Sequence, residues 1–359
     1  MKSAADRLKK VFANADFDKA LILETSSDDS NFLYLTGYAP GWYDGCVLLA
    51  DRTGMKLFAN KLVCGTAEKN RPKELEVVPI DTNEQMADAL RKEIGDCRVG
   101  VNREFVPYNQ YMNLKKMLPN ARIENLSGAF AKARSIKCMD EIANIRKAVK
   151  ITKDTIESVR SGLSDNMSEL DVSTQVDLGF REAHAGNAFN SIVAFGADTA
   201  MPHYMPSENK RLKSNTIVLM DVGARYMNYC GDITRTFFYK PDRSSVKYKK
   251  LKEIYEVVET AQQKGFEEME SGKSGSAADM AARNYIDSYR NGIYKGRFIH
   301  TLGHSIGIDV HDGARLYYKV KYTLAENMIF SDEPGIYIPG LGGVRIEDDI
   351  LVGRKPRFL

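Results

Sequence analysis

The segment NTIVLMDVGARYMNYCGDITRT constrains the fold more than any other part of the sequence. Two apolar, strand-like runs flank a turn-prone centre, which predicts a β-hairpin. Asp221 and Asp232 lie on these runs with ten residues between them, and an even number allows two residues to face each other directly, with Cβ atoms about 5 Å apart. Two apposed carboxylates raise each other's pKa and require a shared proton or a cation. The segment therefore predicts a metal site. The alternative is a wet edge, where Asp221 starts a turn and Asp232 pairs with Arg235.

A second predicted hairpin, SDEPGIYIPGLGGVRIEDDI, also carries one acid on each strand. Thirteen residues separate Glu333 from Glu347, so direct apposition needs a bulge or an irregular loop, for which the Pro- and Gly-rich connection gives the freedom. Asp348 and Asp349 compete with Glu347 as ligands. In a strand, Glu347 shares its face with Arg345 and Asp349, whereas Asp348 points away.

Histidine is rare in the chain, and it is clustered. Of five histidines, His300, His304 and His311 all lie in HTLGHSIGIDVH, and His203 lies in MPHYMP. Each alone could cap a helix or fill a polar gap, but the cluster indicates a functional site. Four carboxylates and one imidazole are a hard, oxygen-rich set that suits two divalent ions better than structural zinc. Thr234, on the face of Asp232, is predicted to hydrogen-bond a ligand carboxylate.

Hydrophobic patterning divides the chain into two predicted domains. The first third alternates strand-like runs (19–24, 46–50, 55–59 and 75–80) with amphipathic helices (83–94 and 108–118), which predicts an α/β domain. A long helix is predicted from about Ala129 to Ser161, and we place the boundary just before it, giving domains 1–127 and 128–359. Antiparallel strand pairs and longer helices (168–183, 246–269 and 276–290) follow, which predicts an α+β domain.

Charge and cysteine usage exclude several classes of protein. The net charge of +3 comes from 51 basic and 48 acidic residues that are well mixed, so nucleic acid is not an expected partner. The N-terminus MKSAADRLKK lacks the apolar core of a secretory signal and no run is long enough to span a membrane, so we expect a cytoplasmic protein without membrane contact. Five scattered cysteines imply no disulfide framework or thiolate metal site and are expected to be small buried residues.

The ordered Asp, Asp, His, Glu and Glu resemble the ligand set of the pita-bread metallopeptidases, a family that includes aminopeptidase P, prolidase, methionine aminopeptidase and creatinase. The resemblance runs over most of residues 135–352. The N-terminal unit, including NFLYLTGY, resembles the extra domain of aminopeptidase P, prolidase and creatinase. The resemblance implies a creatinase-like α/β N-terminal domain plus an α+β pita-bread catalytic domain built on antiparallel sheet and flanking helices. Ser305, Asp312 and Asp332 depart from the usual family wording, which puts the fine substrate preference in doubt but leaves the ligands intact.

The resemblance also implies an activity, namely hydrolysis of Xaa-Pro peptide bonds by a hydroxide that bridges two divalent metals (Mn, Co, Fe or Zn). The enzyme would be an Xaa-Pro dipeptidase (prolidase) or an Xaa-Pro aminopeptidase that acts on proline-containing peptides. It would also be a homodimer. The implied metal ligands are Asp221, Asp232, His304, Glu333 and Glu347. The implied catalytic residues are His203, His311 and Glu333, and the implied substrate-binding residues are His300, Arg315 and Arg345.

Several alternatives stay open at this point. A methionine aminopeptidase-like exopeptidase and an inactive peptide-binding relative share the fold. Arg315 lies where prolidases commonly have an arginine that binds the substrate carboxylate, but a solvated arginine on a loop fits as well. Arg345 either orients Glu347, contacts substrate or forms a structural ion pair.

Overall fold

The computed structural model describes residues 4–25 and 28–359, which form two compact units, Met1–Arg134 and Ser135–Leu359. The division falls after Arg134, later in the chain than the boundary predicted after residue 127. The first three residues of the segment used to judge a secretory signal lie outside the described part. Among the described residues, no helix is both long and apolar enough to cross a membrane.

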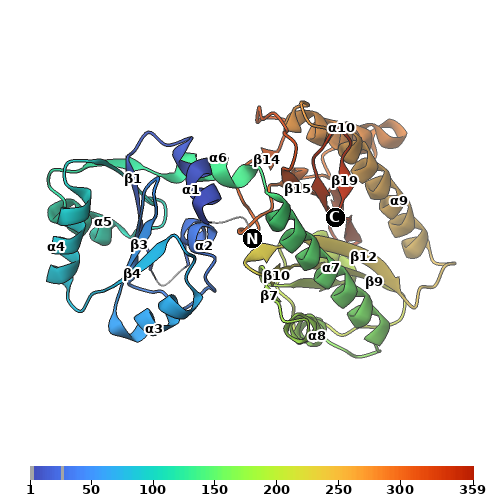
Figure 1. The fold of residues 1–359 in the computed structure, drawn as a ribbon. Coiled ribbons are helices and arrows are strands. Elements are labelled where there is room, and N and C mark those ends of the chain that lie inside the picture. Colours follow the sequence, from blue (N-terminus) through green and yellow to red (C-terminus); the bar gives the residue numbers. More distant parts are fainter. Residues whose placement is uncertain (1–3, 26–27) are drawn as a thin grey trace. The chain divides into compact units, whose positions relative to one another are not determined.

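The first unit is built on a six-stranded mixed sheet with the order β4-β3-β2-β1-β5-β6 (Figure 1). Its strands are β1 (Lys19–Leu23), β2 (Val47–Ala50), β3 (Met55–Ala59), β4 (Leu75–Pro79), β5 (Arg98–Val101) and β6 (Arg122–Asn125). Its helices are α1 (Ala4–Phe12), α2 (Ser30–Thr36), α3 (Lys61–Asn70), α4 (Asn83–Ile94), α5 (Tyr108–Met117) and α6 (Ser127–Ser135). β1 pairs with β2 and β2 with β3 in antiparallel fashion, whereas the other three pairs are parallel. The α/β prediction is confirmed.

The helical stretch predicted from about Ala129 to Ser161 is confirmed, but it is interrupted at residues 136–138. The chain forms α6 and, after this break, α7 (Met139–Gly162). Cys138 has an extended backbone (φ −82, ψ 170), and its N–H donates to the Glu141 carboxylate at 2.8 Å. This contact satisfies an amide that has no partner within the helix, so a new helix begins here.

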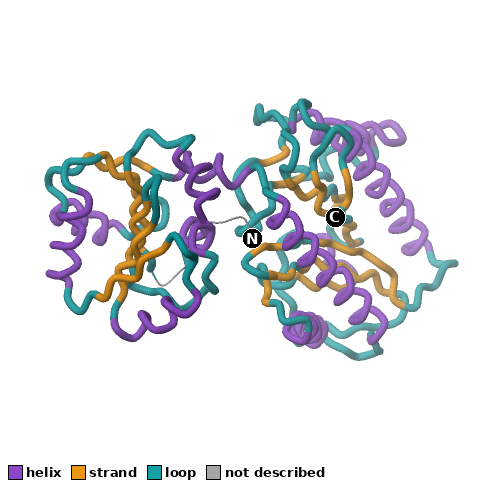
Figure 2. The backbone as a smooth tube through the Cα atoms, in the orientation of Figure 1, coloured by secondary structure: helices purple, strands orange, loops and turns teal. Residues whose placement is uncertain are grey.

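The second unit surrounds several small antiparallel sheets with long helices, as Figure 2 shows. The helices are α7, α8 (Glu169–Glu182), α9 (Val246–Glu267) and α10 (Gly275–Ser288), with the 3-10 helices η1 (Gly196–Ala200) and η2 (Tyr289–Gly292). Apolar side chains of α9 and α10, including Ile254, Val258 and Ala282, pack into one buried cluster with Phe330 and Val344 of the strands. The α+β prediction is confirmed.

Two hairpins dominate the strands of this unit. The first comprises β9 (Thr216–Val222), β10 (Ala224–Tyr226), β11 (Tyr229–Cys230) and β12 (Ile233–Tyr239). The second comprises β15 (Ile329–Asp332), β16 (Gly335–Ile338), β17 (Gly342–Arg345) and β18 (Asp348–Leu351). The Glu347 N–H donates to the Thr234 carbonyl at 3.2 Å, so the two hairpins lie side by side.

Short strands complete the unit: β7 (Gly186–Asn187), β8 (Ile192–Phe195), β13 (Gly303–His304), β14 (Arg315–Leu316) and β19 (Arg357–Phe358). β8 extends the β9–β12 sheet, and β13 pairs with β14. All five cysteines are free, but only Cys46 and Cys230 are buried; the prediction of buried cysteines is wrong for Cys64, Cys97 and Cys138, which are partly exposed.

Candidate metal centre

The first hairpin brings its two aspartates to the same side of the sheet but not directly opposite each other. Asp221 is opposite Thr234, and Asp232 precedes Thr234 by two residues, so it is a diagonal neighbour of Asp221. The prediction of direct apposition is wrong because the turn consists of Met227 and Asn228, both with positive φ, which shifts the register by two residues.

The wet-edge alternative for Asp232 is also wrong. Asp232 is only 5% exposed. Arg235, its proposed partner on that edge, instead donates to the Asp348 carboxylate at 2.8 Å. Asp232 is therefore a buried acid that needs another source of positive charge.

The second hairpin places its two glutamates directly opposite each other. Asp332 is opposite Asp348 and Gly335 is opposite Arg345, so one register runs through the interruption in which Glu333 and Glu347 lie. Ile338 is opposite Gly342, so three residues form the loop between the strands. An odd-numbered loop allows two residues with an odd number of residues between them, such as Glu333 and Glu347, to lie directly opposite each other. The predicted irregular loop supplies the register, and no bulge is needed.

His304, on β13, approaches both hairpins. Its Nε2 lies 3.6 Å from Oδ2 of Asp232 and 3.3 Å from Oε1 of Glu333. One ligand atom from each of Asp232, His304 and Glu347 lies within 4.8 Å of the others. Gly303 is required for this approach, because a Cβ atom there would overlap the carbonyl oxygen of Ser331.

The acids of this cluster are electrostatically uncompensated. Burial, followed by repulsion from Glu347, raises the pKa of Asp232 well above its ordinary value. Burial and then repulsion from Glu333 do the same to the pKa of Glu347. Burial also opposes ionisation of Glu333, but its hydrogen bond and charge interaction with His304 outweigh this and lower its pKa to about 2. The cluster is therefore short of positive charge.

Three ligand-type atoms of the cluster are buried without a hydrogen-bond partner among the described residues: Asp221 Oδ1, Asp232 Oδ1 and His304 Nδ1. Buried polar atoms are rarely left this way, so the two carboxylate oxygens indicate a site for a cation. Carboxylate oxygens with one imidazole are a suitable donor set for hard or borderline divalent ions. The five predicted ligands thus fit a divalent metal centre.

Arg345 holds the ligand side chains in place. Its guanidinium donates to Thr234 Oγ1 at 3.0 Å, to the Tyr337 hydroxyl at 2.9 Å and to Asp221 Oδ2 at 2.5 Å. Thr234 in turn donates to Glu347 Oε2 at 2.6 Å, which confirms its predicted hydrogen bond to a ligand carboxylate. Of the three roles left open for Arg345, the structure favours orientation of the predicted ligands. Arg345 contacts Asp221 directly and reaches Glu347 through Thr234.

Sequence reasoning did not identify Tyr337. Its hydroxyl joins Arg345 to His300, whose Nε2 is 2.8 Å away. The period of two along β16 places Tyr337 on the face of Gly335, the residue opposite Arg345, and this pattern was the available signal.

Asp349, considered as a competing ligand, instead contacts the backbone of Asp232. It accepts the Asp232 N–H at 3.1 Å, and burial raises its pKa to about 8. Asp348 points away, as predicted, and binds Lys153 and Arg235.

One cavity of about 660 Å³ contains the whole predicted site. It is lined by all ten predicted residues: His203, Asp221, Asp232, His300, His304, His311, Arg315, Glu333, Arg345 and Glu347. The His311 ring lies 4.2 Å from that of His304 and almost perpendicular to it, at 82°. The sequence analysis missed the apolar and aromatic part of the lining, which includes Phe189, Ile192, Ile299, Val310 and Tyr317. The cavity thus combines a metal-type acid cluster with an apolar wall and two arginines, Arg315 and Arg345.

Comparison with known proteins gives consistent results for both units. The model for metallopeptidase family M24 matches residues 143–354, and the model for the creatinase/prolidase N-terminal domain matches residues 5–136. An Xaa-Pro dipeptidase of Pyrococcus horikoshii is 31% identical over 98% of this chain and 95% of its own.

Solved structures show the same two-domain architecture. The Xaa-Pro dipeptidase from Bacillus anthracis has a TM-score of 0.86 and 30% identity, and the match covers 99% of this chain and 96% of the other. The X-Pro aminopeptidase from Thermotoga maritima also has a TM-score of 0.86, with 25% identity and the same coverage.

Proposed function

Because the chain belongs to metallopeptidase family M24, we propose that it hydrolyses Xaa-Pro peptide bonds with two divalent metal ions, held by the five ligands Asp221, Asp232, His304, Glu333 and Glu347. Its creatinase/prolidase N-terminal domain and its similarity to proteins named Xaa-Pro dipeptidase and X-Pro aminopeptidase support this substrate class.

One observation carries the metal part of the proposal. Four buried carboxylates and His304 converge in one cavity, and two of these carboxylates keep an oxygen atom without a hydrogen-bond partner among the described residues. The free energy needed to remove several carboxylates from water is larger than the free energy gained from their contacts with Arg345 and His304. Bound cations would supply the missing stabilisation.

When bound, two divalent ions would polarise the scissile carbonyl and supply a water nucleophile at neutral pH. Glu333 lies beside His304 and 3.9 Å from His300, so it is placed to accept a proton from that water and pass it to the leaving nitrogen. His203 and His311 face the same cavity and would donate hydrogen bonds to the substrate or to the developing oxyanion. The apolar wall formed by residues such as Ile192 and Val310 would accept the proline ring.

The dipeptidase reading is the one we propose. Arg315 lines the cavity and is opposite His304 in the β13–β14 register, so its guanidinium can reach a carboxylate that follows the proline. A dipeptide has its free carboxylate at that position, whereas a longer peptide has an amide there.

The test combines metal analysis with product release. The purified protein is loaded with Mn, Co, Fe or Zn, its metal content is measured, and release of proline from Ala-Pro is followed. We expect about two ions per chain and metal-dependent release. His304→Asn should lose at least about 100-fold in activity and bind less metal. His184→Asn is the matched control, because His184 is exposed and lies outside the cavity lining.

Other outcomes separate the alternatives. Release of methionine from Met-Ala peptides without cleavage of Ala-Pro would indicate a methionine aminopeptidase. Fewer than one ion per chain, with no turnover of any of these peptides, would indicate an inactive peptide-binding relative.

A further inference from the structure

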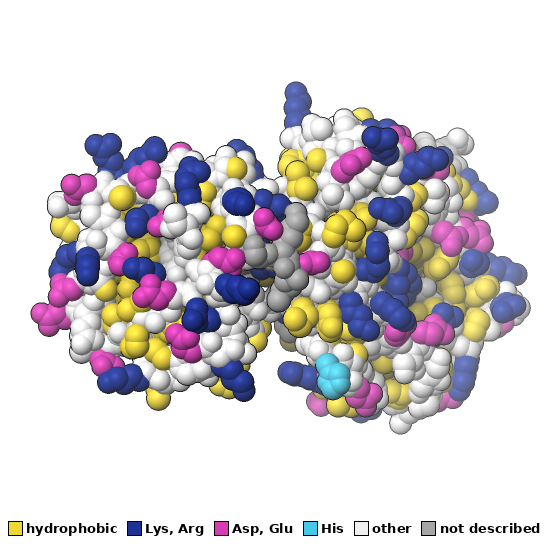
Figure 3. Space-filling view, viewed as in Figure 1, with side chains coloured by type: hydrophobic (Ala, Val, Ile, Leu, Met, Phe, Trp, Pro, Cys, Tyr) yellow, Lys and Arg dark blue, Asp and Glu magenta, His cyan; other side chains and the backbone are white. Residues whose placement is uncertain are grey.

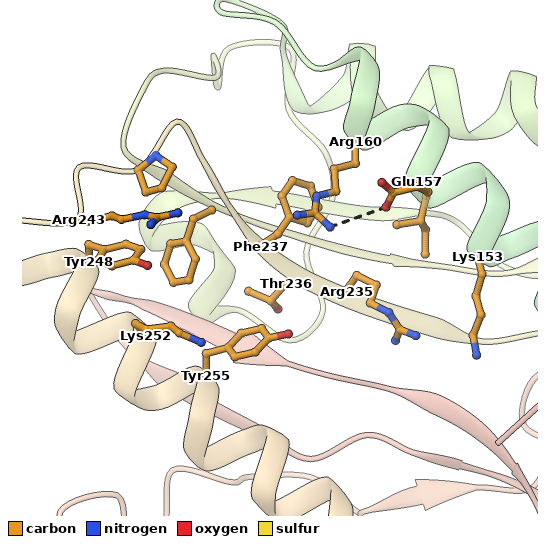
Figure 4. Close-up of a pocket in the computed structure, with 13 residues that line it drawn as sticks. Lys153, Glu157, Arg160, Arg235, Thr236, Phe237, Arg243, Tyr248, Lys252 and Tyr255 are labelled. Atoms are coloured by element: carbon orange, nitrogen blue, oxygen red, sulfur yellow. Dashed lines mark ion pairs between the residues drawn. The ribbon is translucent and has the colours of Figure 1, made fainter. Parts of the chain in front are cut away.

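A second cavity, of about 600 Å³, lies on the second unit between α7, β12 and α9 (Figure 4). It shares no lining residue with the cavity of the metal centre. Four consecutive residues of β12, from Arg235 to Phe238, line this second cavity, whereas Thr234 hydrogen-bonds Glu347 in the metal centre. The proposed peptidase reaction uses none of the second cavity's lining residues.

The lining of this cavity, which we call the basic pocket, concentrates positive charge. It contains one acidic side chain, Glu157, and five basic ones: Lys153, Arg160, Arg235, Arg243 and Lys252. The whole chain carries a net charge of only +3, so this is a local excess and not a general property of the surface. Figure 3 shows Lys and Arg side chains gathered over this face of the second unit. A concave surface lined by one sign of charge attracts ligands of the opposite sign.

Two ends of the basic pocket differ in how far their charges are already compensated. Lys153 and Arg235 both contact Asp348, at 2.9 and 2.8 Å, so their positive charge is partly compensated. At the other end, Arg243 has no hydrogen-bond or ion-pair partner within the described part of the chain. Lys252 has an exposed pairing with Glu256 at 3.5 Å, and its Nζ lies over the Tyr255 ring at 4.8 Å. Arg243 and Lys252 are therefore available to an anion.

Aromatic side chains form much of the remaining wall. Phe237, Phe238, Tyr248 and Tyr255 all line the pocket, and the rings of Phe238 and Tyr248 are 4.8 Å apart at an angle of 63°. Arg160 lies over the ring of Phe237 at 5.0 Å, which leaves a planar cation beside the aromatic surface. Rings and guanidinium planes together favour a ligand that has a flat π-system as well as a negative charge.

We propose that the basic pocket binds a small anion that carries both a phosphate group and an aromatic ring system, as a nucleotide does. The phosphate pairs with Arg243 and Lys252, and the ring packs against the tyrosine and phenylalanine side chains. The volume of about 600 Å³ is that of an ordinary small-molecule site. A merely solvated basic face would need neither the concavity nor the aromatic wall.

The test uses the metal-loaded full-length enzyme and calorimetric titration with adenosine monophosphate. We expect saturable binding that Arg243→Ala and Lys252→Ala each weaken about tenfold or more, because each removes a charged contact to phosphate. Lys249→Ala, a change on the same helix outside the pocket lining, is the matched control and should leave binding unchanged. Hydrolysis of Ala-Pro by the Arg243 and Lys252 variants should also be unchanged, which shows that they are folded.

Two further ligands test the two halves of the proposed chemistry. Adenosine and inorganic phosphate should each bind at least tenfold more weakly than adenosine monophosphate. Equal binding of inorganic phosphate would overturn the role of the ring, and equal binding of adenosine would overturn the role of the charge. Absence of saturable binding at millimolar nucleotide, or binding that survives both substitutions, would overturn the site itself.

Discussion

Arg345 shows how one buried side chain joins several residues of the proposed metal centre at once. Its planar guanidinium reaches Thr234, Tyr337 and Asp221 from three different nitrogens, whereas the donors of a lysine all lie on one nitrogen and cannot reproduce this spacing. We therefore predict that Arg345→Lys lowers metal affinity by about 10- to 100-fold, as loss of a ligand-orienting contact commonly does. Metal titration of the apoprotein measures this. The exposed substitution Arg181→Lys is the control, and unchanged affinity in the Arg345 variant would show that the ligands are held without it.

We propose that Arg315 determines which peptide length the same cavity accepts. If its guanidinium binds the free carboxylate of a dipeptide, Arg315→Ala loses a charged hydrogen bond of about 1.5–3 kcal/mol. We predict a fall of about 10- to 100-fold in kcat/KM for Ala-Pro, mostly through KM, and little change for Ala-Pro-Ala. Steady-state kinetics on both peptides, with the exposed Lys321→Ala as control, decides the matter. Equal losses on the two peptides would remove Arg315 from substrate selection.

Strand periodicity made it possible to predict which acids share a face. It did not make it possible to predict Tyr337, whose role depends on contacts with other strands and loops. The acids at 221, 232, 333 and 347 share faces because side chains alternate along strands, and the sequence contains that information. Tyr337 works through contacts with His300 and Arg345 that only the folded chain brings together. The period of two along β16 places Tyr337 on the face of Gly335, but it does not identify His300 as a partner.

The turn of the hairpin that carries Asp221 and Asp232 contains a residue whose backbone conformation is unfavourable. Met227 and Asn228 both have positive φ, and Met227 is 59% exposed, so its side chain gains little burial in return. Asparagine tolerates this backbone region much better than methionine does. We predict that Met227→Asn stabilises the second unit by about 0.5–1 kcal/mol without altering metal content. Thermal unfolding measures the gain, and Met205→Asn, an exposed change at a residue without positive φ, should produce none.

Among the elements, helices with a long apolar face were predictable almost to their ends, as in α4, α9 and α10. The break between α6 and α7 was not, because no Gly or Pro marks it and the apolar spacing continues through Ile136. The register of the first hairpin was misjudged by two residues, since turn chemistry at a Met-Asn pair gives a weak signal. Sequence patterns therefore located the strands, whereas the conformation of the turn determined which residues lie opposite each other.

At the scale of the molecule, the two units deal with buried acids in different ways. In the second unit several carboxylates surround a site that fits divalent metal, and cations would supply the missing charge. In the first unit, Glu24 is only 4% exposed, and burial, followed by repulsion from Asp29, raises its pKa to about 9. The folded first unit thus favours the protonated form of Glu24 at neutral pH. A proton has the role there that we propose for cations in the second unit.

This difference predicts how stability depends on pH. Because the folded pKa of Glu24 is above its unfolded value, its contribution to the free energy of unfolding is fully present below about pH 4.5 and is lost as the pH rises toward 9. Glu24→Gln removes the titration and retains a carbonyl to accept the Asp29 N–H, which Glu24 accepts at 3.3 Å. The variant should therefore be close to wild type at pH 5 and increasingly more stable from pH 7 to 9. Melting temperatures at these pH values, together with hydrogen exchange of β1 and α2, measure the difference. The exposed Glu104→Gln is the control, and a difference between Glu24→Gln and wild type that stays constant with pH would show that Glu24 does not titrate in this range on folding.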